Sequence, residues 1–168
     1  MTNKNPITPT EVQFQPVLAA QVYTASATDP AEMKKAFGLA VGQIDDFLQS
    51  TGAQVSGPPR AIYTEYGEGE AEFTVAIPLA SGGEGGTTDG SVVVDEIPGG
   101  RAFRFIHKGP YPDLSDTYDQ ITEWMKKEGM LKSEAEWEAH APIWEEYVTD
   151  PGSTPEDDLL TYIYVPMP

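Results

Sequence analysis

Residues 94–107 read VDEIPGGRAFRFIH, and residues 12–25 read VQFQPVLAAQVYTA. In both stretches a proline, Pro98 or Pro16, is followed by alternating apolar residues, which is the pattern of a half-buried strand. Each stretch then leads into a segment with helical spacing. The same order of patterns therefore occurs twice in one chain.

Two more pairs of segments match at nearly the same separation. Proline-led segments reach Tyr63 in one half and Tyr147 in the other, and EFTVAIPL (72–79) resembles LTYIYVPM (160–167). Repeats of this kind indicate duplicated units, so we predict an internal duplication. The alternative is that any two strand–helix–strand–strand stretches look alike.

Each half reads as strand, helix, strand, strand. The first helix is expected from Asp29-Pro30 to about Ser50, and the second from Asp113 to about Glu128. This order predicts an α+β fold of tandem β-α-β-β units, in one antiparallel sheet or two adjoining sheets. We expect both helices on one face and a ligand groove on the other face, between the repeats. The prediction is a single domain over 1–168, with repeat one at about 11–80, a Gly-rich connector at 81–90 and repeat two at about 91–167.

Composition excludes several classes of protein. Ten Lys and Arg stand against 27 Asp and Glu, giving a net charge of −17, which opposes binding to nucleic acid or to anionic membranes. The chain has no Cys and two His, so thiolate metal sites and three-His zinc sites are impossible. We therefore expect no metal and no cofactor. The polar start predicts no signal peptide, and we expect a cytoplasmic protein.

The strand at 143–148 carries the most informative pattern. Alternation places Ile143, Glu145 and Tyr147 on one face. The matching strand of the first half presents Ala61 and Tyr63, so two tyrosines and one carboxylate are predicted to meet between the halves. Aromatic rings around a carboxylate favour flat, lipophilic, cationic ligands. The alternative is that these tyrosines are core residues and that the glutamate faces solvent.

Further aromatic and titratable side chains were assigned to this region. Phe37, in the first helix, is predicted to contact the ligand. His107 ends a strand and is either a base in the pocket or a structural residue. Trp137 either covers the groove as a lid or anchors its loop. Trp144 alternates with Glu145, so we expect it to face away from the ligand and to pack under the helices.

Several motifs in order resemble the GyrI-like, or effector-binding, domain family. They are a Pro-Gly-Gly bend, a His-x-Gly-Pro-Tyr step into a helix, an E-x-Y strand, a D-P turn and a closing strand that ends in Pro. In this chain they fall at Pro98–Gly100, His107–Tyr111, Glu145–Tyr147, Asp150-Pro151 and Val165-Pro166. The resemblance covers the second half well, and the first half through the duplication.

The resemblance implies a groove between two repeats that binds hydrophobic, often cationic molecules, with Glu145 as the characteristic ligand contact. Some members of the family are fused to DNA-binding helices. About ten polar residues precede the first expected strand here, so we expect a stand-alone domain without direct nucleic-acid contact. Glu146 departs from the family pattern, where this position is often apolar.

Three hypotheses of function follow from these patterns. The first is a binding module for hydrophobic, cationic or aromatic compounds. The second is a hydrolase of cyclopropane-type electrophiles, with Glu145 and Tyr147 as the catalytic pair. The third is a gyrase-inhibitor-like protein whose acidic surface binds a basic protein partner.

Overall fold

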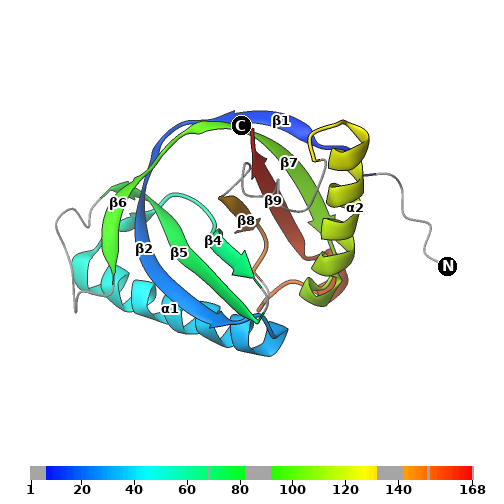
Figure 1. Ribbon diagram of the computed structural model, residues 1–168. Coiled ribbons are helices and arrows are strands. Elements are labelled where there is room, and N and C mark those ends of the chain that lie inside the picture. Colours follow the sequence, from blue (N-terminus) through cyan, green and yellow to red (C-terminus); the bar gives the residue numbers. More distant parts are fainter. Residues whose placement is uncertain (1–6, 68, 82–91, 132–141, 151, 168) are drawn as a thin grey trace.

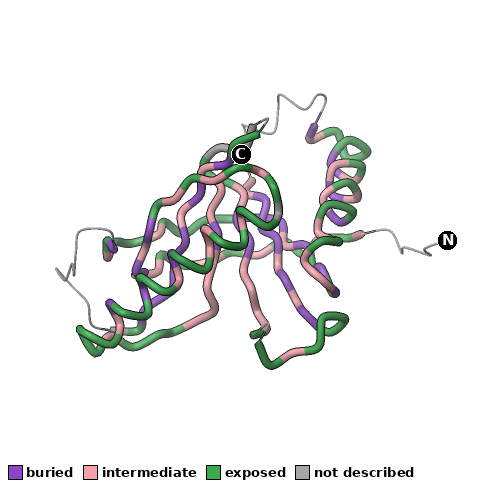
Figure 2. Tube along the Cα trace, turned by 90° about the horizontal axis from the view of Figure 1, so that it is seen from below, coloured by how far each residue is buried: buried purple, intermediate pink, exposed green. Residues whose placement is uncertain are grey.

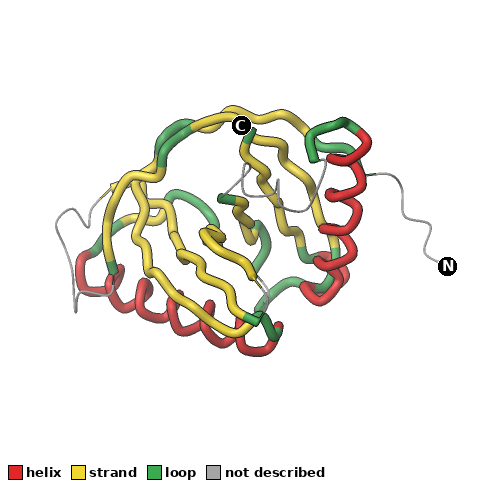
Figure 3. The backbone as a smooth tube through the Cα atoms, in the orientation of Figure 1, coloured by secondary structure: helices red, strands yellow, loops and turns green. Residues whose placement is uncertain are grey.

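The computed structural model describes residues 7–67, 69–81, 92–131, 142–150 and 152–167. All strands in these ranges belong to an antiparallel sheet that curls into a half-barrel, with α1 and α2 at its periphery (Figures 1 and 3). The α+β class and the antiparallel sheet are thus confirmed. The predicted connector lies, except for Ser81, outside the described residues.

The strands run in the order β1-β7-β9-β8-β4-β5-β2-β6, and β3 pairs with β5. Their bounds are β1 Thr10–Phe14, β2 Val17–Ala27, β3 Gln54–Val55, β4 Arg60–Gly67, β5 Glu70–Ser81, β6 Val93–Ile97, β7 Gly100–Lys108, β8 Ile143–Tyr147 and β9 Leu160–Pro166. The β4–β8 pair lies at the centre, flanked by β5 and β2 on one side and by β9 and β7 on the other. This order is compatible with two similar units, but the duplication of the sequence itself stays a prediction.

Helix α1 spans Pro30–Thr51, close to the range expected from the sequence. Pro30 at its start has the fixed φ that suits a first helical turn. Gly52 ends the helix at φ 72°, and its amide donates to the carbonyl of Leu48 at 2.9 Å. Asp29 occupies the N-cap position directly before Pro30, as the sequence predicts, but its side chain forms no capping hydrogen bond.

Helix α2 spans Leu114–Lys127 and follows a 3₁₀ turn, Tyr111–Asp113. The predicted cap Asp113 already has helical backbone angles (φ −81°, ψ −4°) because it closes this turn, and it makes no side-chain cap bond. A capping side chain needs the extended backbone that Asp113 lacks. None of the described helices is long and apolar enough to cross a membrane.

Both helices pack against the same face of the sheet, which we call the helix face. On α1, Ile44 and Phe47 pack with Phe73 and Val75 of β5. A second core cluster joins α2 to β7 and β9 and contains Phe103, Phe105, Ile121, Met125, Ile163 and Val165. Figure 2 shows buried residues concentrated in the strands and exposed residues on the outer turns of the helices. The β4–β8 pair therefore lies where the two cores meet.

The two ends of the sheet approach one another at a tight crossing. Strand β1 continues into β2, and β6 continues into β7, while β1 pairs with β7 and β2 with β6. A Cβ on Gly99 would lie 2.5 Å from the carbonyl oxygen of Phe14 and 2.8 Å from the nitrogen of Pro16. The crossing is thus formed by the segments around Pro16 and Pro98, which matched each other in the sequence. Strand β1 was not expected from the sequence, which placed the first strand at Val17.

Gly99→Ala should lower the free energy of unfolding by about 1–3 kcal/mol. The added methyl group would clash with backbone atoms of Phe14 and Pro16, which cannot move away by a change of rotamer. Gly100→Ala is the matched control, since a Cβ there has no atom within 4 Å. Denaturant titration of both variants measures the difference. Equal stability of the two variants would contradict a tight crossing.

Candidate functional site

Glu145 lies in β8 at the centre of the sheet and is only 4% exposed. Its register partners are Ala61 of β4 and Ile163 of β9, both almost fully buried. The Tyr147 hydroxyl donates to Glu145 Oε1 at 2.7 Å, and the Tyr118 hydroxyl donates to Oε2 at 2.5 Å. Each carboxylate oxygen therefore has a phenol donor, and a further side-chain hydrogen bond comes from Tyr63.

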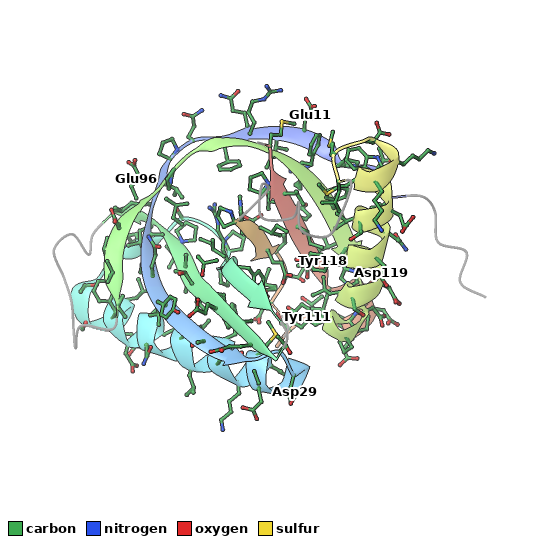
Figure 4. All side chains as sticks on the ribbon, in the orientation of Figure 1. Glu11, Asp29, Glu96, Tyr111, Tyr118 and Asp119 are labelled. Carbon is green, nitrogen blue, oxygen red and sulfur yellow. The ribbon has the colours of Figure 1, made fainter. Side chains whose placement is uncertain are left out.

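Aromatic rings from both halves of the chain surround this carboxylate. The ring of Tyr147 meets Phe37 of α1 edge-on at 5.0 Å and Tyr111 of the 3₁₀ turn at 5.8 Å, both centroid distances. The ring centroid of Tyr63 of β4 lies 5.7 Å from that of Phe73. In Figure 4, Tyr118 and Tyr111 lie on the sheet side of α2, and Asp119 lies on its outer side. The cluster joins α1, α2 and the central strands.

Burial sets the protonation chemistry of the cluster. Loss of solvation raises the pKa of Glu145, while bonds from Tyr118 and Tyr147, the nearby His107 and the bond from Tyr63 act in the opposite direction. Burial and then the Glu145 charge raise the pKa of Tyr147 well above its ordinary value of 10.0. Tyr147 therefore keeps its proton and acts as a donor to the carboxylate.

Tyr111 belongs to the same electrostatic environment. Its pKa is raised first by burial, and then by the negative charges of Asp150 and Glu145. Asp150 is itself held in the turn after β8, where its side chain accepts from the Gly152 amide at 2.9 Å. A second carboxylate thus contributes to the negative potential on the Tyr111 side of the cluster.

His107 lies one residue before the end of β7 and is buried, with both ring nitrogens within hydrogen-bond distance of a partner. Nε2 lies 3.1 Å from the carbonyl oxygen of Pro110, and Nδ1 lies 2.7 Å from the Thr117 hydroxyl. A carbonyl oxygen can only accept, so Nε2 carries a proton. The imidazole thereby ties β7 to the 3₁₀ turn and to α2. Its predicted role as a base toward a ligand stays a prediction.

Most of the residues predicted from the sequence come together around Glu145. Tyr147, Tyr63 and Phe37 lie in the aromatic cluster, Ala61 is buried beside it, and Ile143 packs at the edge of the α2 core. Their roles as ligand contacts stay predictions. Trp137 lies outside the described residues.

The sequence analysis did not identify Tyr118 of α2, whose hydroxyl donates directly to Glu145. Tyr111 appeared only as part of a motif, yet its ring contacts Tyr147. A signal for Tyr118 was present, because a buried tyrosine hydroxyl normally needs a hydrogen-bond partner. The acceptor, Glu145, can be identified only when the position of α2 on the sheet is known.

The predicted location of the site on the face opposite the helices is wrong. Register and packing place Ala61, Tyr63, Glu145 and Tyr147 on the helix face, between α1 and α2. Trp144, expected under the helices, instead lies on the other face and stacks on Tyr164. Alternation in β8 separated the two sets correctly, but it does not indicate which set the helices cover.

Within the described part of the chain, no group of three or more His, Cys, Asp or Glu side chains is arranged to hold a metal ion. Around Glu145, the described residues supply a buried carboxylate, several phenol donors and the faces and edges of aromatic rings. Such a set can neutralise a positive charge and pack against flat apolar groups.

The chain belongs to the GyrI-like family, because the model of the GyrI-like small molecule binding domain matches residues 12–168. A comparison with curated protein sequences finds no significant match.

Solved structures show the same fold at low sequence identity. The EcmrR C-terminal domain has a TM-score of 0.77 at 17% identity, covering 95% of this chain and 96% of that one. A hydrolase encoded by lin2189 from Listeria innocua has a TM-score of 0.58 at 14% identity, covering 94% and 90%. SAV2435, solved bound to tetraphenylphosphonium, has a TM-score of 0.60 at 12% identity, covering 95% and 93%.

Glu145→Gln should flatten the pH dependence of stability. The folded protein holds the pKa of Glu145 above its ordinary value of 4.5, so its stabilising contribution is complete below pH 4.5. That contribution is lost as the pH rises through the folded pKa. Denaturant unfolding at a series of pH values should show the variant gaining stability relative to wild type across this rise, and parallel profiles would contradict it.

Proposed function

We propose that this domain binds lipophilic, aromatic small molecules that carry a positive charge, with Glu145 as the counter-charge. A small-molecule-binding role is the family's, and the cationic class is our inference from the site. One observation carries it: a carboxylate buried in the sheet centre and lined by aromatic rings.

A buried carboxylate is costly unless it is paired with a positive charge. Among the described residues, no lysine or arginine forms an ion pair with Glu145, and the tyrosines that bind it are neutral donors. A cationic ligand would supply the missing charge. The phenol and phenyl rings of Tyr147, Tyr111 and Phe37 would supply apolar contacts and cation–π attraction.

The overall charge of −17 supports the same class of ligand, because a negative potential concentrates cations near the protein. The relative SAV2435 was solved with tetraphenylphosphonium, a lipophilic cation. That ligand is therefore a suitable probe for this chain, although sequence identity to SAV2435 is 12%.

Tetraphenylphosphonium should bind the wild-type protein, and Glu145→Gln should weaken binding at least tenfold because the amide keeps the shape but not the charge. Isothermal titration calorimetry measures both affinities. Glu123→Gln, which removes the same charge from the exposed surface of α2, is the matched control and should bind like wild type. Equal weakening by both substitutions would reduce the effect to long-range electrostatics and contradict the proposal.

Tetraphenylborate provides a control on the ligand side, since it has nearly the same shape and the opposite charge. We expect no saturable binding of this anion to wild type. Comparable affinity for the two ions would mean that shape and apolar surface, and not Glu145, decide binding.

Affinity for the cation should also rise with pH, because only the ionised carboxylate attracts it and the pKa of Glu145 is raised by burial. The rise should extend above pH 4.5 and be absent in Glu145→Gln. Calorimetry between pH 4 and 8 tests this, and a profile shared by both proteins would exclude Glu145 as the titrating group.

A second candidate function is hydrolysis of a cyclopropane-type electrophile at the same site. The supporting observation is that burial raises the pKa of Glu145 next to two phenol donors, which is the direction that general acid or base catalysis requires of a carboxyl group. Ionised Glu145 would accept a proton from water while the water oxygen bonds to a ring carbon and one ring C–C bond breaks. Tyr147 would donate a hydrogen bond to a carbonyl oxygen conjugated with the ring, which receives the released electron pair. Mass spectrometry of the compound after incubation separates turnover from stoichiometric binding. A protein partner for the acidic surface stays an untested prediction.

A further inference from the structure

The face of the sheet opposite the helices, which we call the back face, carries its own cluster of aromatic and charged side chains. Trp144 of β8 stacks on Tyr164 of β9, with ring centroids 3.8 Å apart and planes at 8°. Phe14 of β1 meets Trp144 edge-on at 5.4 Å. Strands β7 and β9 lie between β1 and β8 in the sheet, so this contact shows that the sheet curls toward its back face.

Two arginines, from strands on opposite sides of the cluster, each lie over one of its aromatic rings. The Arg60 guanidinium, from β4, lies over the Trp144 ring at 4.6 Å. The Arg104 guanidinium, from β7, lies over the Tyr162 ring of β9 at 4.9 Å. Each side chain extends over the strand beside its own, so the Arg60 guanidinium lies above β8 and the Arg104 guanidinium lies above β9.

Among the side chains that the structure describes, the carboxylate in this cluster is that of Glu146. Its Oε2 lies 3.8 Å from Arg60 Nε, and its Oε1 accepts from the Tyr164 hydroxyl at 3.3 Å. Burial and then the Glu146 charge raise the pKa of Tyr164 to about 12, and the charge of Arg104 acts in the opposite direction. Two positive charges thus face one negative charge across a network of four side chains.

The arginines are incompletely satisfied in this network. The Nε atoms of Arg60 and Arg104 are buried, and neither has a hydrogen-bond partner among the described residues. A buried donor without a partner is destabilising, and the guanidinium fork matches the geometry of a carboxylate. One more carboxylate would therefore balance the charge of the cluster and supply the missing acceptors.

We propose that the back face is a second binding site, which takes a small aromatic carboxylate. The carboxylate group lies between Arg60 and Arg104, and the aromatic ring contacts Tyr162 and Ile106. Ile106 is the register partner of Tyr162 and is 49% exposed, which gives the ring an apolar surface that solvent also reaches. This site and the Glu145 site lie on opposite faces of β8 and select opposite charges.

The test is calorimetric titration with 2-naphthoate, with the uncharged 2-naphthamide as the matched ligand. We expect saturable binding of one naphthoate and at least tenfold weaker binding of the amide. Arg104→Gln and Arg60→Gln should each weaken naphthoate binding at least tenfold. Arg101 of β7 forms an exposed ion pair with Glu11 of β1. Arg101→Gln therefore removes the same charge outside the proposed site and should leave the affinity unchanged.

Absence of saturable naphthoate binding would overturn the proposal, as would equal affinity for the amide or an equal loss in Arg101→Gln. If Arg60→Gln does not fold, as judged by circular dichroism, Arg104→Gln decides the question. Saturating tetraphenylphosphonium should leave naphthoate affinity unchanged, whereas displacement would place naphthoate at the Glu145 site and reject a second one. Failure of tetraphenylphosphonium to bind would count against the proposed function and leave the naphthoate result intact.

Discussion

The burial of one carboxylate in the middle of the sheet is the interaction on which the arrangement of the site depends. Glu145 brings together phenol groups from elements far apart in the sequence, since Tyr63 comes from β4, Tyr118 from α2 and Tyr147 from β8. Without that acceptor, the phenol groups would lose the hydrogen-bond partner that they share at the junction of the two cores. The two halves of the chain are therefore joined by polar contacts at a position where apolar packing would be expected.

The sequence predicted the central strands and the division of each strand into two faces. Alternation in β8 and β4 is a local property, and it correctly grouped Glu145 and Tyr147 with Tyr63 and separated them from Trp144 and Glu146. Helix α1 was equally predictable, because Pro30 and Gly52 mark its ends by their own backbone preferences. These features depend on residues close together in the chain.

The features that could not be predicted depend on tertiary placement. Alternation divides a strand into two faces, but only packing shows that α1 and α2 cover the face of Glu145. The bond from Tyr118 requires α2 to be docked, and strand β1 exists because its partner β7 lies beside it. Glu146, which departs from the family pattern, contacts Arg60 and Tyr164 on the two strands that flank β8.

The crossing at Gly99 also affects how the molecule behaves in a crowded solution. The strands at the two ends of the sheet, β1 and β6, have five residues each. They are short because the chain soon passes through the crossing, from β1 into β2 and from β6 into β7, and both β2 and β7 are interior strands. They carry Glu11, Asp95 and Glu96, which are exposed. Short, acidic edge strands resist edge-to-edge pairing with another copy. The geometry that closes the half-barrel thereby also discourages aggregation through the growth of intermolecular sheets.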